Sequence, residues 1–435
     1  MKKNKLINGL KLVFAITLLS FYSCDNEPID GELNSNSNQI TKGTEITEEI
    51  AKEVALNFFN KTYKSQNYLQ KNSTKTKTTI SSIETIKDYN SKTGIYIVNI
   101  EPEGFVLVTS NSKNVPIAAH SETGAFEFNE NSPDGLKSWI AENIVFNDIL
   151  EAREPIEEVE KQWYYVMPLP DDDTNPNDDG ETTGSGNNSS SNARYSHTVN
   201  EQVGPLMQTT WGQGFPYNNF TPNNNPTGCV AVATAQIMRY HEWPNNYNWA
   251  GMPNRPFTTN TGLEIASLMS DIGINVNMNY SASGSGADSE DAKNSLINDY
   301  GYSSTATYSS YNFSTVKQEI YMYNRPVYMD GYHSFKTSGT WFWKQTSYQN
   351  GHAWVCDGYK QQYDLYIYNE GTTYEYTQQE NRYEWLHMNW GWNNAGNGWF
   401  YKNHLWVNGV NILVDGNSVN PNFQYNRECI YRIKP

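Results

Sequence analysis

The sequence has little cysteine, no excess of positive charge and no long hydrophobic segment. Four cysteines in 435 residues exclude a small disulfide-rich scaffold. Lys and Arg number 31 against 47 Asp and Glu, and this net charge of −16 excludes a general nucleic-acid binder. Cysteines, histidines and acids do not gather at metal-ligand spacing, and there is no glycine-rich phosphate loop. We therefore expect no metal and no cofactor in this polar chain.

The first 24 residues have the pattern of an export signal. Lysines precede an apolar run over residues 12–19, which is too short for a transmembrane anchor, the alternative interpretation. Cys24 follows a small residue after this run and resembles the cysteine of a bacterial lipobox, which is acylated after cleavage. We expect export with membrane attachment through lipid at Cys24, and simple secretion with an incidental Cys24 is the alternative.

Residues 25–170 are expected to form a small α+β domain. Apolar residues at helical spacing follow Thr47, and a second helical pattern begins at Leu136 and ends before Pro155. Two β-branched or aromatic runs, 95–100 and 104–108, flank Glu-Pro-Glu and predict a hairpin. The polar residues that follow cannot form a core, so we expect a disordered, protease-sensitive linker over 171–195.

Residues 196–435 contain a candidate nucleophile. Thr227 is predicted to cap a helix of small and apolar residues that runs to Tyr240 and stops before Pro244. Cys229 would lie in its first turn, where backbone N–H groups and the helix dipole favour the thiolate and lower its pKa. The structural alternative is a small core residue, because cysteine is among the most buried residue types.

A nucleophilic cysteine needs a base, and among seven histidines His352 has the most suitable surroundings. It precedes a short apolar run bounded by glycines, which predicts a buried strand that begins at His352. Asn389 is expected to accept the ring N–H, and Trp390 to shield that contact, unless both belong to a plain core strand. The Cys229 N–H and Gln213 are candidate oxyanion donors.

These residues lie in motifs that together resemble the streptopain family of papain-like cysteine peptidases. The matching segments run in order from about Val203 to the C-terminal end: WGQG around Gln213, Gly228 to Met238 with Tyr240-His241, Gly351-His352-Ala353, Asn389-Trp390-Gly391-Trp392 and Ile433-Lys434-Pro435. Residues 271–280 and the Gly/Ser loop 281–286 resemble the family's substrate-binding region. Residues 104–108 and 118–126 resemble its propeptide.

The resemblance implies an α+β papain-like peptidase domain over 196–435. A helical part would carry the cysteine helix beside an antiparallel sheet part, preceded by signal peptide 1–24, inhibitory propeptide 25–170 and linker 171–195. It implies Cys229 as nucleophile, His352 as base, Gln213 as oxyanion donor, and Asn389 with Trp390 as the ring-orienting pair. Ser283, Gly284 and Gly351 would bind substrate. Residues 328–352 and 361–382 look longer than the family pattern and are expected to flank the site.

The predicted function is that of an exported bacterial cysteine endopeptidase, made as a zymogen and either secreted or anchored as a surface lipoprotein. Its partners would be protein or peptide substrates and its own propeptide. One alternative is a related Cys-His amidase or transglutaminase acting on wall peptides. Another is a non-catalytic surface-binding lipoprotein. Whether Cys356 and Cys429 pair stays open.

Overall fold

The computed structural model describes residues 45–64, 78–87, 92–129, 132, the helical residues 136, 139, 140, 143, 144, 147 and 150, then 157–167, 193–256, 259–338, 345–402, 412–414, 417–419 and 425–435. The export signal, Cys24 and most of the expected linker lie outside these residues. Residues 40–435 form one compact unit. None of the described helices is long and apolar enough to cross a membrane.

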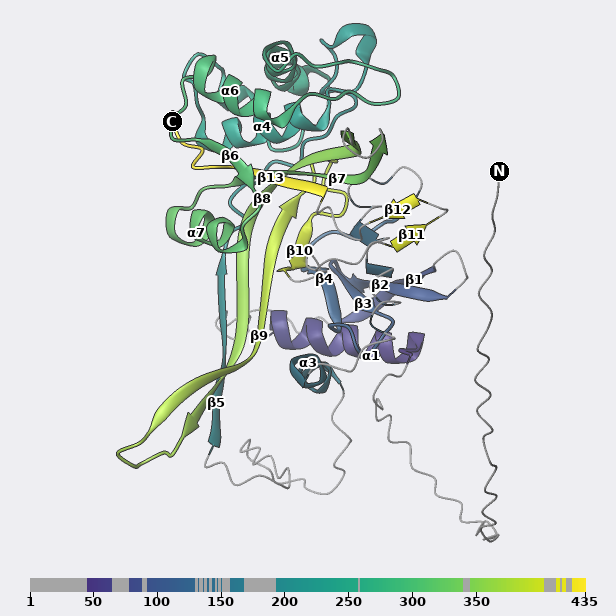
Figure 1. Cartoon of the computed structure of the whole chain (residues 1–435), viewed down its shortest axis with the longest axis vertical. Helices are drawn as coiled ribbons and strands as arrows, with labels where there is room; N and C mark the ends of the chain where they lie inside the picture. The colour runs from purple at the N-terminus through teal and green to yellow at the C-terminus, as the bar shows by residue number, and fades with distance from the viewer. Residues whose placement is uncertain are drawn as a thin grey trace, which may run out of the picture. The chain divides into compact units, whose positions relative to one another are not determined.

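Before the linker, helices pack against an antiparallel sheet as expected (Figure 1). Helix α1 begins where predicted, because the Thr47 hydroxyl accepts a hydrogen bond from Ile50 N. The predicted hairpin is formed by β2 and β3. The elements are α1 (Glu48–Phe59), the π-helix η1 (Asn60–Lys64), β1 (Thr79–Lys87), β2 (Thr93–Glu101), β3 (Phe105–Thr109), β4 (Ile117–Ser121) and α3 (Glu157–Val166).

After the linker, four α-helices accompany long antiparallel strands among the described residues. The elements are β5 (Ala193–Val203), η3 (Pro222–Asn224), α4 (Cys229–His241), η4 (Trp249–Gly251), α5 (Thr259–Asn275), α6 (Ser289–Asn298), β6 (Thr307–Ser310), α7 (Phe313–Tyr323), β7 (Val327–Ser338), β8 (Gln345–Tyr368), β9 (Tyr376–Asn389), β10 (Gly398–Tyr401), β11 (Ile412–Val414), β12 (Asn417–Val419) and β13 (Tyr425–Tyr431). Figure 1 shows α4, α5 and α6 grouped together. This mixture of helices and antiparallel sheet is the predicted fold class.

One sheet runs through both halves of the described chain. Its strand order is β1-β2-β3-β4-β10-β9-β8-β7-β13-β6, and β5 pairs with β8. The join between the halves is the pair β4 and β10, in which Ala119 lies opposite Phe400. Side chains from both halves also fill shared cores, such as Trp139 and Ile140 with Trp354 and Trp390. The segment before the linker therefore completes the sheet of the segment after it.

Two local predictions need correction. Residues 193–195, expected in the linker, are the first residues of β5, which pairs antiparallel with β8 from Ala193 opposite Tyr368 to Val203 opposite Tyr359. The strand expected to begin at His352 begins at Gln345, so His352 lies inside it. In both cases long-range pairing extends a strand beyond its apolar run. Cys356 and Cys429 are free thiols in this structure.

Candidate active site

Cys229 is the first residue of α4 and Gly228 is its N-cap. The φ angle of Gly228 is 86°, in the left-handed region that favours glycine, and a Cβ there would lie 3.0 Å from the Ser285 carbonyl oxygen. The prediction that Thr227 caps this helix is wrong. The buried Thr227 hydroxyl has no hydrogen-bond partner among the described residues. The glycine thus presents Cys229 at the helix start.

Cys229 and His352 line the same cleft, which has a volume of about 400 Å³. Strand pairing places His352 opposite Gly331 on β7, while Cys229 enters from the start of α4. The cleft is lined by Cys229, Val230, Ser285, Gly286, Ala287, Asp288, Ser289, Asp330, Gly331, Gly351, His352 and Ala353. The two residues predicted as nucleophile and base are therefore brought together.

The electrostatics of Cys229 differ from the prediction. Burial raises the pKa of the Cys229 thiol above its ordinary value and outweighs the backbone groups of Ala353, Val230 and Cys229 itself, which lower it. The nearby Asp330 carboxylate also raises this pKa. The helix start lowers the pKa as expected, but the effect of burial is larger.

His352 is held by backbone and by aromatic rings. Its Nε2 lies 3.0 Å from the Trp390 carbonyl oxygen. Because a carbonyl only accepts, Nε2 carries the proton, and in the neutral ring Nδ1 is the basic nitrogen. The His352 ring stacks on Trp354, with centroids 6.1 Å apart and planes 12° apart, and on Trp390 at 6.3 Å and 29°. The ring is thus fixed in orientation inside β8.

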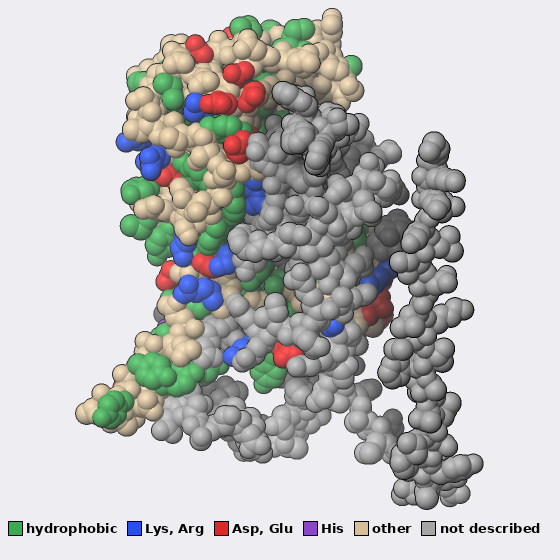
Figure 2. All heavy atoms as spheres, in the orientation of Figure 1, with side chains coloured by type: hydrophobic (Ala, Val, Ile, Leu, Met, Phe, Trp, Pro, Cys, Tyr) green, Lys and Arg blue, Asp and Glu red, His purple; other side chains and the backbone are tan. Residues whose placement is uncertain are grey.

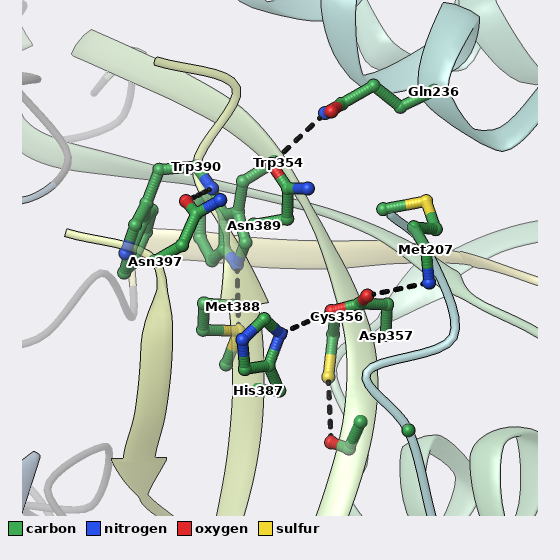
Figure 3. A network of polar contacts seen from close by, with 12 residues as sticks. Met207, Gln236, Trp354, Cys356, Asp357, His387, Met388, Asn389, Trp390 and Asn397 are labelled. Carbon is green, nitrogen blue, oxygen red and sulfur yellow. Dashed lines mark hydrogen bonds and ion pairs between the residues drawn. The ribbon is translucent and has the colours of Figure 1, made fainter. Parts of the chain in front are cut away.

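The predicted contact between Asn389 and the His352 ring is replaced by other bonds (Figure 3). The Asn389 oxygen accepts from Gln236 Nε2 over 3.2 Å and from Gly391 N over 3.2 Å. These bonds occupy both lone pairs of the oxygen. The Asn389 amide nitrogen donates to the Thr209 carbonyl over 2.7 Å. The Trp390 carbonyl therefore holds the His352 ring where the Asn389 side chain was predicted to do so.

Trp390 is fixed from its far side. Its backbone N–H donates to Asn397 Oδ1 over 2.9 Å (Figure 3), and its indole N–H donates to the Gly396 carbonyl over 3.1 Å. The indole is buried and lies 5.2 Å from the Trp354 ring centroid. Trp390 therefore combines two contacts with His352, through its carbonyl oxygen and through its ring.

Gln213 lies beside the start of the cysteine helix. Its carbonyl oxygen accepts from the Thr227 backbone N–H over 2.9 Å, two positions before Cys229 in the sequence. The Gln213 side chain is half-buried. This backbone bond holds Gln213 near the start of α4, but Gln213 is not among the residues that line the cleft.

The Gly/Ser loop borders the cleft, but the loop residues that line it are neighbours of the predicted ones. Ser285 and Gly286 line the cleft, whereas Ser283 and Gly284 are not among its lining residues. A Cβ at Gly284 would have no atom within 4 Å, which places it in open space. Gly351 lines the cleft as predicted. The resemblance indicated the loop, but which of its residues face the cleft depends on how the loop folds.

Asp330 is a cleft residue that the sequence did not indicate as functional. It is buried, accepts from the Tyr308 hydroxyl over 2.8 Å and from Glu428 N over 3.2 Å, and lines the cleft. Burial raises the pKa of Asp330 to about 6. No motif marks this residue, because its position depends on the pairing of β7 with β8 and β13.

The prediction that residues 361–382 flank the site is wrong. They form the distal part of the β8–β9 hairpin, which leads away from α4 together with β5 (Figure 1). From His352 to Tyr368 the strand extends about 50 Å at roughly 3.3 Å per residue. Tyr374 and Tyr376 are exposed there, and Figure 2 shows hydrophobic side chains near the hairpin end. No group of three or more His, Cys, Asp or Glu residues within the described ranges could hold a metal ion.

Two family models match this chain. The model of the Peptidase C10 family matches residues 211–246 and 245–400, which include Cys229 and His352. The model of the Spi protease inhibitor matches residues 43–143, ahead of the linker. The chain belongs to the peptidase C10, or streptopain, family.

Relatives of this streptopain-family chain resemble it in sequence or in structure. Streptopain of Streptococcus pyogenes is 24% identical over 365 residues, covering 71% of this chain and 74% of its own. The thiol protease/hemagglutinin PrtT of Porphyromonas gingivalis is 24% identical over 347 residues, covering 70% of this chain and 33% of its own. A prointerpain A fragment of Prevotella intermedia has the same fold, with a TM-score of 0.50 and 20% identity, covering 81% of this chain and 99% of its own.

This streptopain-family protein is therefore a cysteine-type peptidase and a zymogen, in which the Spi-like segment is the intramolecular inhibitor. The two alternatives, a wall-peptide amidase or transglutaminase and a non-catalytic binding protein, are not favoured by these matches.

The contact between propeptide and peptidase contains a buried polar cluster. His120 on β4 is fully buried, and its Nδ1 is hydrogen-bonded to the Tyr63 hydroxyl. Its ring meets Trp385 of β9 edge to face, with centroids 5.2 Å apart. Lys360 of β8 is 1% exposed, and its Nζ lies 4.7 Å from the Tyr63 ring centroid and 5.9 Å from that of Trp399. Residues of both segments thus enclose the cluster.

The charges around His120 disfavour its protonated form. Burial lowers the pKa of His120 well below 6.5, and Lys360 and His387 lower it further. Burial also lowers the pKa of Lys360, to about 8, against the opposing effect of Glu122. Among the described residues, neither His120 Nε2 nor Lys360 Nζ has a hydrogen-bond partner. The zymogen thus holds a neutral histidine beside a buried lysine.

Proposed function

We propose that this zymogen matures into an exported bacterial cysteine endopeptidase that uses Cys229 as nucleophile and His352 as general base. The observation that carries the proposal is the meeting of both residues in one cleft, with His352 oriented by the Trp390 carbonyl. A thiol next to an oriented imidazole is the arrangement that acyl transfer needs. Export fits the sequence pattern of residues 1–24.

The proposed chemistry is hydrolysis through an acyl-enzyme. His352 Nδ1 takes the Cys229 proton, and the thiolate attacks the peptide carbonyl carbon to form a tetrahedral oxyanion. The Cys229 N–H and the Gln213 side-chain amide donate to that oxyanion. The imidazolium protonates the leaving amine as the C–N bond breaks. Water, deprotonated by His352, then hydrolyses the thioester and restores the thiol.

The thiolate of Cys229 needs a counter-charge. Burial raises the pKa of this thiol, which disfavours the reactive thiolate. The imidazolium of His352 supplies the opposite charge that stabilises the thiolate. Substrate would lie along Gly351 and the loop containing Ser283 and Gly284, whose neighbours Ser285 and Gly286 line the cleft.

The maturation cut is proposed to lie before Ala193. Residues 193–203 are paired with β8 along their whole length, and a paired strand cannot enter a protease cleft without first detaching. The sequence over 171–192 contains only Asp, Glu, Asn, Ser, Thr, Gly and Pro, which is the composition typical of an accessible linker. We propose that the mature chain keeps β5.

Membrane attachment is a separate part of the proposal. Lipid on Cys24 would hold the zymogen at a membrane, and a cut in the linker would release the peptidase domain without this anchor. The sequence around Cys24 supports acylation of this residue, and simple secretion is the alternative. Mass spectrometry of the purified N-terminal fragment distinguishes them, because diacylation adds the mass of two fatty acyl chains and glycerol.

The decisive experiment compares wild-type protein with Cys229→Ala and His352→Ala on casein and on quenched peptides. Wild type should shorten to a fragment that starts before Ala193 and should cleave casein internally. The active-site thiol reagent E-64 should label it at Cys229. Cys229→Ala purified alone should stay full length, and His352→Ala should lose nearly all turnover. An active His352→Ala enzyme would assign the base to another histidine. Wild type that is cut but cleaves no peptide would refute the proposed activity.

A further inference from the structure

We propose that Gln236 is a positioning residue that, paired with Asn389, fixes Cys229, His352 and Gln213 relative to one another. The proposal rests on the proposed function. Neither amide touches the reacting atoms. Their pair lies where the three segments that carry these groups come together (Figure 3).

The first link runs from the cysteine helix. Gln236 lies on α4, about two turns after Cys229, and its side chain is fully buried. Its Nε2 donates to Asn389 Oδ1 over 3.2 Å, and its Oε1 accepts from the Trp211 backbone N–H over 3.4 Å. One side chain thus connects the helix that presents the nucleophile to two other segments.

The second link runs to the segment before Gln213. Trp211 is two positions before Gln213 and bonds to Gln236, while the Thr209 carbonyl accepts from the Asn389 amide over 2.7 Å. Residues 209–211 are therefore hydrogen-bonded to both side-chain amides, that of Gln236 and that of Asn389. Since the chain continues directly to Gln213, a shift of these residues displaces the proposed oxyanion donor.

The third link runs to the base. Asn389 Oδ1 accepts from Gly391 N over 3.2 Å, which closes the turn around Trp390. The carbonyl of Trp390 is the group that holds His352 Nε2 at 3.0 Å. A turn that loses the Asn389 bond can rotate this carbonyl, so the orientation of the His352 ring depends on the amide pair. Small displacements of reacting groups cost large factors in rate.

The test variant is Gln236→Met, which keeps the length of the side chain and removes its amide. We expect kcat to fall roughly tenfold to a hundredfold while KM stays within about twofold, since substrate contacts are unchanged. The pH profile of kcat/KM, which is expected to be bell-shaped because activity needs both the Cys229 thiolate and the His352 imidazolium, should also narrow. A less well oriented imidazolium stabilises the thiolate less, which raises the pKa of the Cys229 limb and lowers that of the His352 limb.

Thr234→Val is the matched control on the same helix. Thr234 is fully buried, like Gln236, and its hydroxyl donates to the Val230 carbonyl over 2.8 Å within α4. This variant also removes a buried polar group, but it leaves the link to Asn389 in place. It should keep the wild-type kcat and the wild-type width of the pH profile. This should hold even if its melting temperature falls as much as that of Gln236→Met.

A double-mutant cycle with Asn389→Leu completes the test. If both amides act as one unit, the double variant should lose little more kcat than the worse single variant. Titration with E-64 gives the concentration of reactive Cys229 thiols in each preparation. Dividing the maximal rate by this concentration gives a kcat that is not lowered by misfolded protein. The inference would be overturned if Gln236→Met kept the wild-type kcat and the wild-type width of the pH profile. It would also be overturned if the losses in kcat of the two single variants added fully in the double variant. A wild-type enzyme without peptidase activity would instead refute the proposed function.

Discussion

Acid should loosen the zymogen through His120. The side chain is fully buried between the propeptide and the peptidase, where burial, Lys360 and His387 hold its pKa well below 6.5. The folded state therefore binds fewer protons at this site than the unfolded state does. Stability from neutral His120 is complete above about pH 6.5 and is lost as the pH falls below that value.

The size of the effect follows from proton linkage. Each pH unit below about 6.5 costs about 1.4 kcal/mol, as long as the pH stays above the folded-state pKa. At pH 5 the loss from this one residue is then at most about 2 kcal/mol, compared with the 5–15 kcal/mol that is roughly typical of whole domains. Lys360 adds to the penalty, because a protonated His120 would place two cations side by side.

The assay uses the intact chain with Cys229→Ala, which prevents self-cleavage, and the same chain with His120→Asn added. Asparagine places its Oδ1 where the Tyr63 hydroxyl meets His120 Nδ1, but it does not titrate. Urea unfolding from pH 7.5 to pH 5 gives the free energy of unfolding of each chain. Other titrations are common to both and cancel in the difference.

His120→Asn should lower stability at pH 7.5, because the ring contacts with Phe58 and Trp385 are lost. The difference in the free energy of unfolding between the two chains should shrink by up to about 2 kcal/mol between pH 7.5 and pH 5. Wild-type protein should correspondingly activate faster at pH 5 than at pH 7.5 when corrected for the pH dependence of the mature enzyme. Parallel pH profiles of the two chains would refute the reasoning.

Three further outcomes follow from the site and the propeptide contact. Gln213→Ala should lower kcat on the order of 10²–10³ while E-64 still labels Cys229, and an unchanged kcat would exclude Gln213 as oxyanion donor. Gly228→Ala should cost about 1–3 kcal/mol in urea unfolding because its φ is positive and its Cβ meets backbone, whereas Gly214→Ala, with open space around its Cβ, should be nearly neutral. Lys360→Met should raise the free energy of unfolding by about 1–2 kcal/mol at pH 7, because the gain from removing a buried charge exceeds the loss of the contacts with aromatic rings. A decrease in the free energy of unfolding would contradict the unfavourable burial inferred for this lysine.

Local signals in the sequence were sufficient for the short elements. Helix α1 follows from the Thr47 cap and apolar spacing, and the β2–β3 hairpin from two β-branched runs around a turn. By contrast, β8 extends on both sides of its apolar run, because β7, β5 and β9 satisfy the hydrogen bonds of its polar residues. Pairing partners distant in sequence carry no local signal, so strand length was underestimated.

The site shows the same division. Motifs identified Cys229 and His352, which line one cleft in the structure. The partner of the His352 ring was misassigned, since motif spacing cannot tell whether Asn389 offers its side chain or its neighbour's carbonyl. Asp330 and Ser285 were missed for a similar reason, because strand register and a loop turn decide which residues face inward.

The pairing of β10 with β4 has a consequence for the mature enzyme. β10 is four residues long and lies between β9 and β4, and its residues are buried. Once the propeptide leaves, β10 keeps one partner among the described strands, and its outer row of N–H and C=O groups becomes an open sheet edge beside Trp399 and Phe400. Open edges next to aromatic side chains promote strand addition between molecules, and a short edge limits that risk. Activation thus leaves the mature sheet with a short edge at β10 that β4 covers in the zymogen.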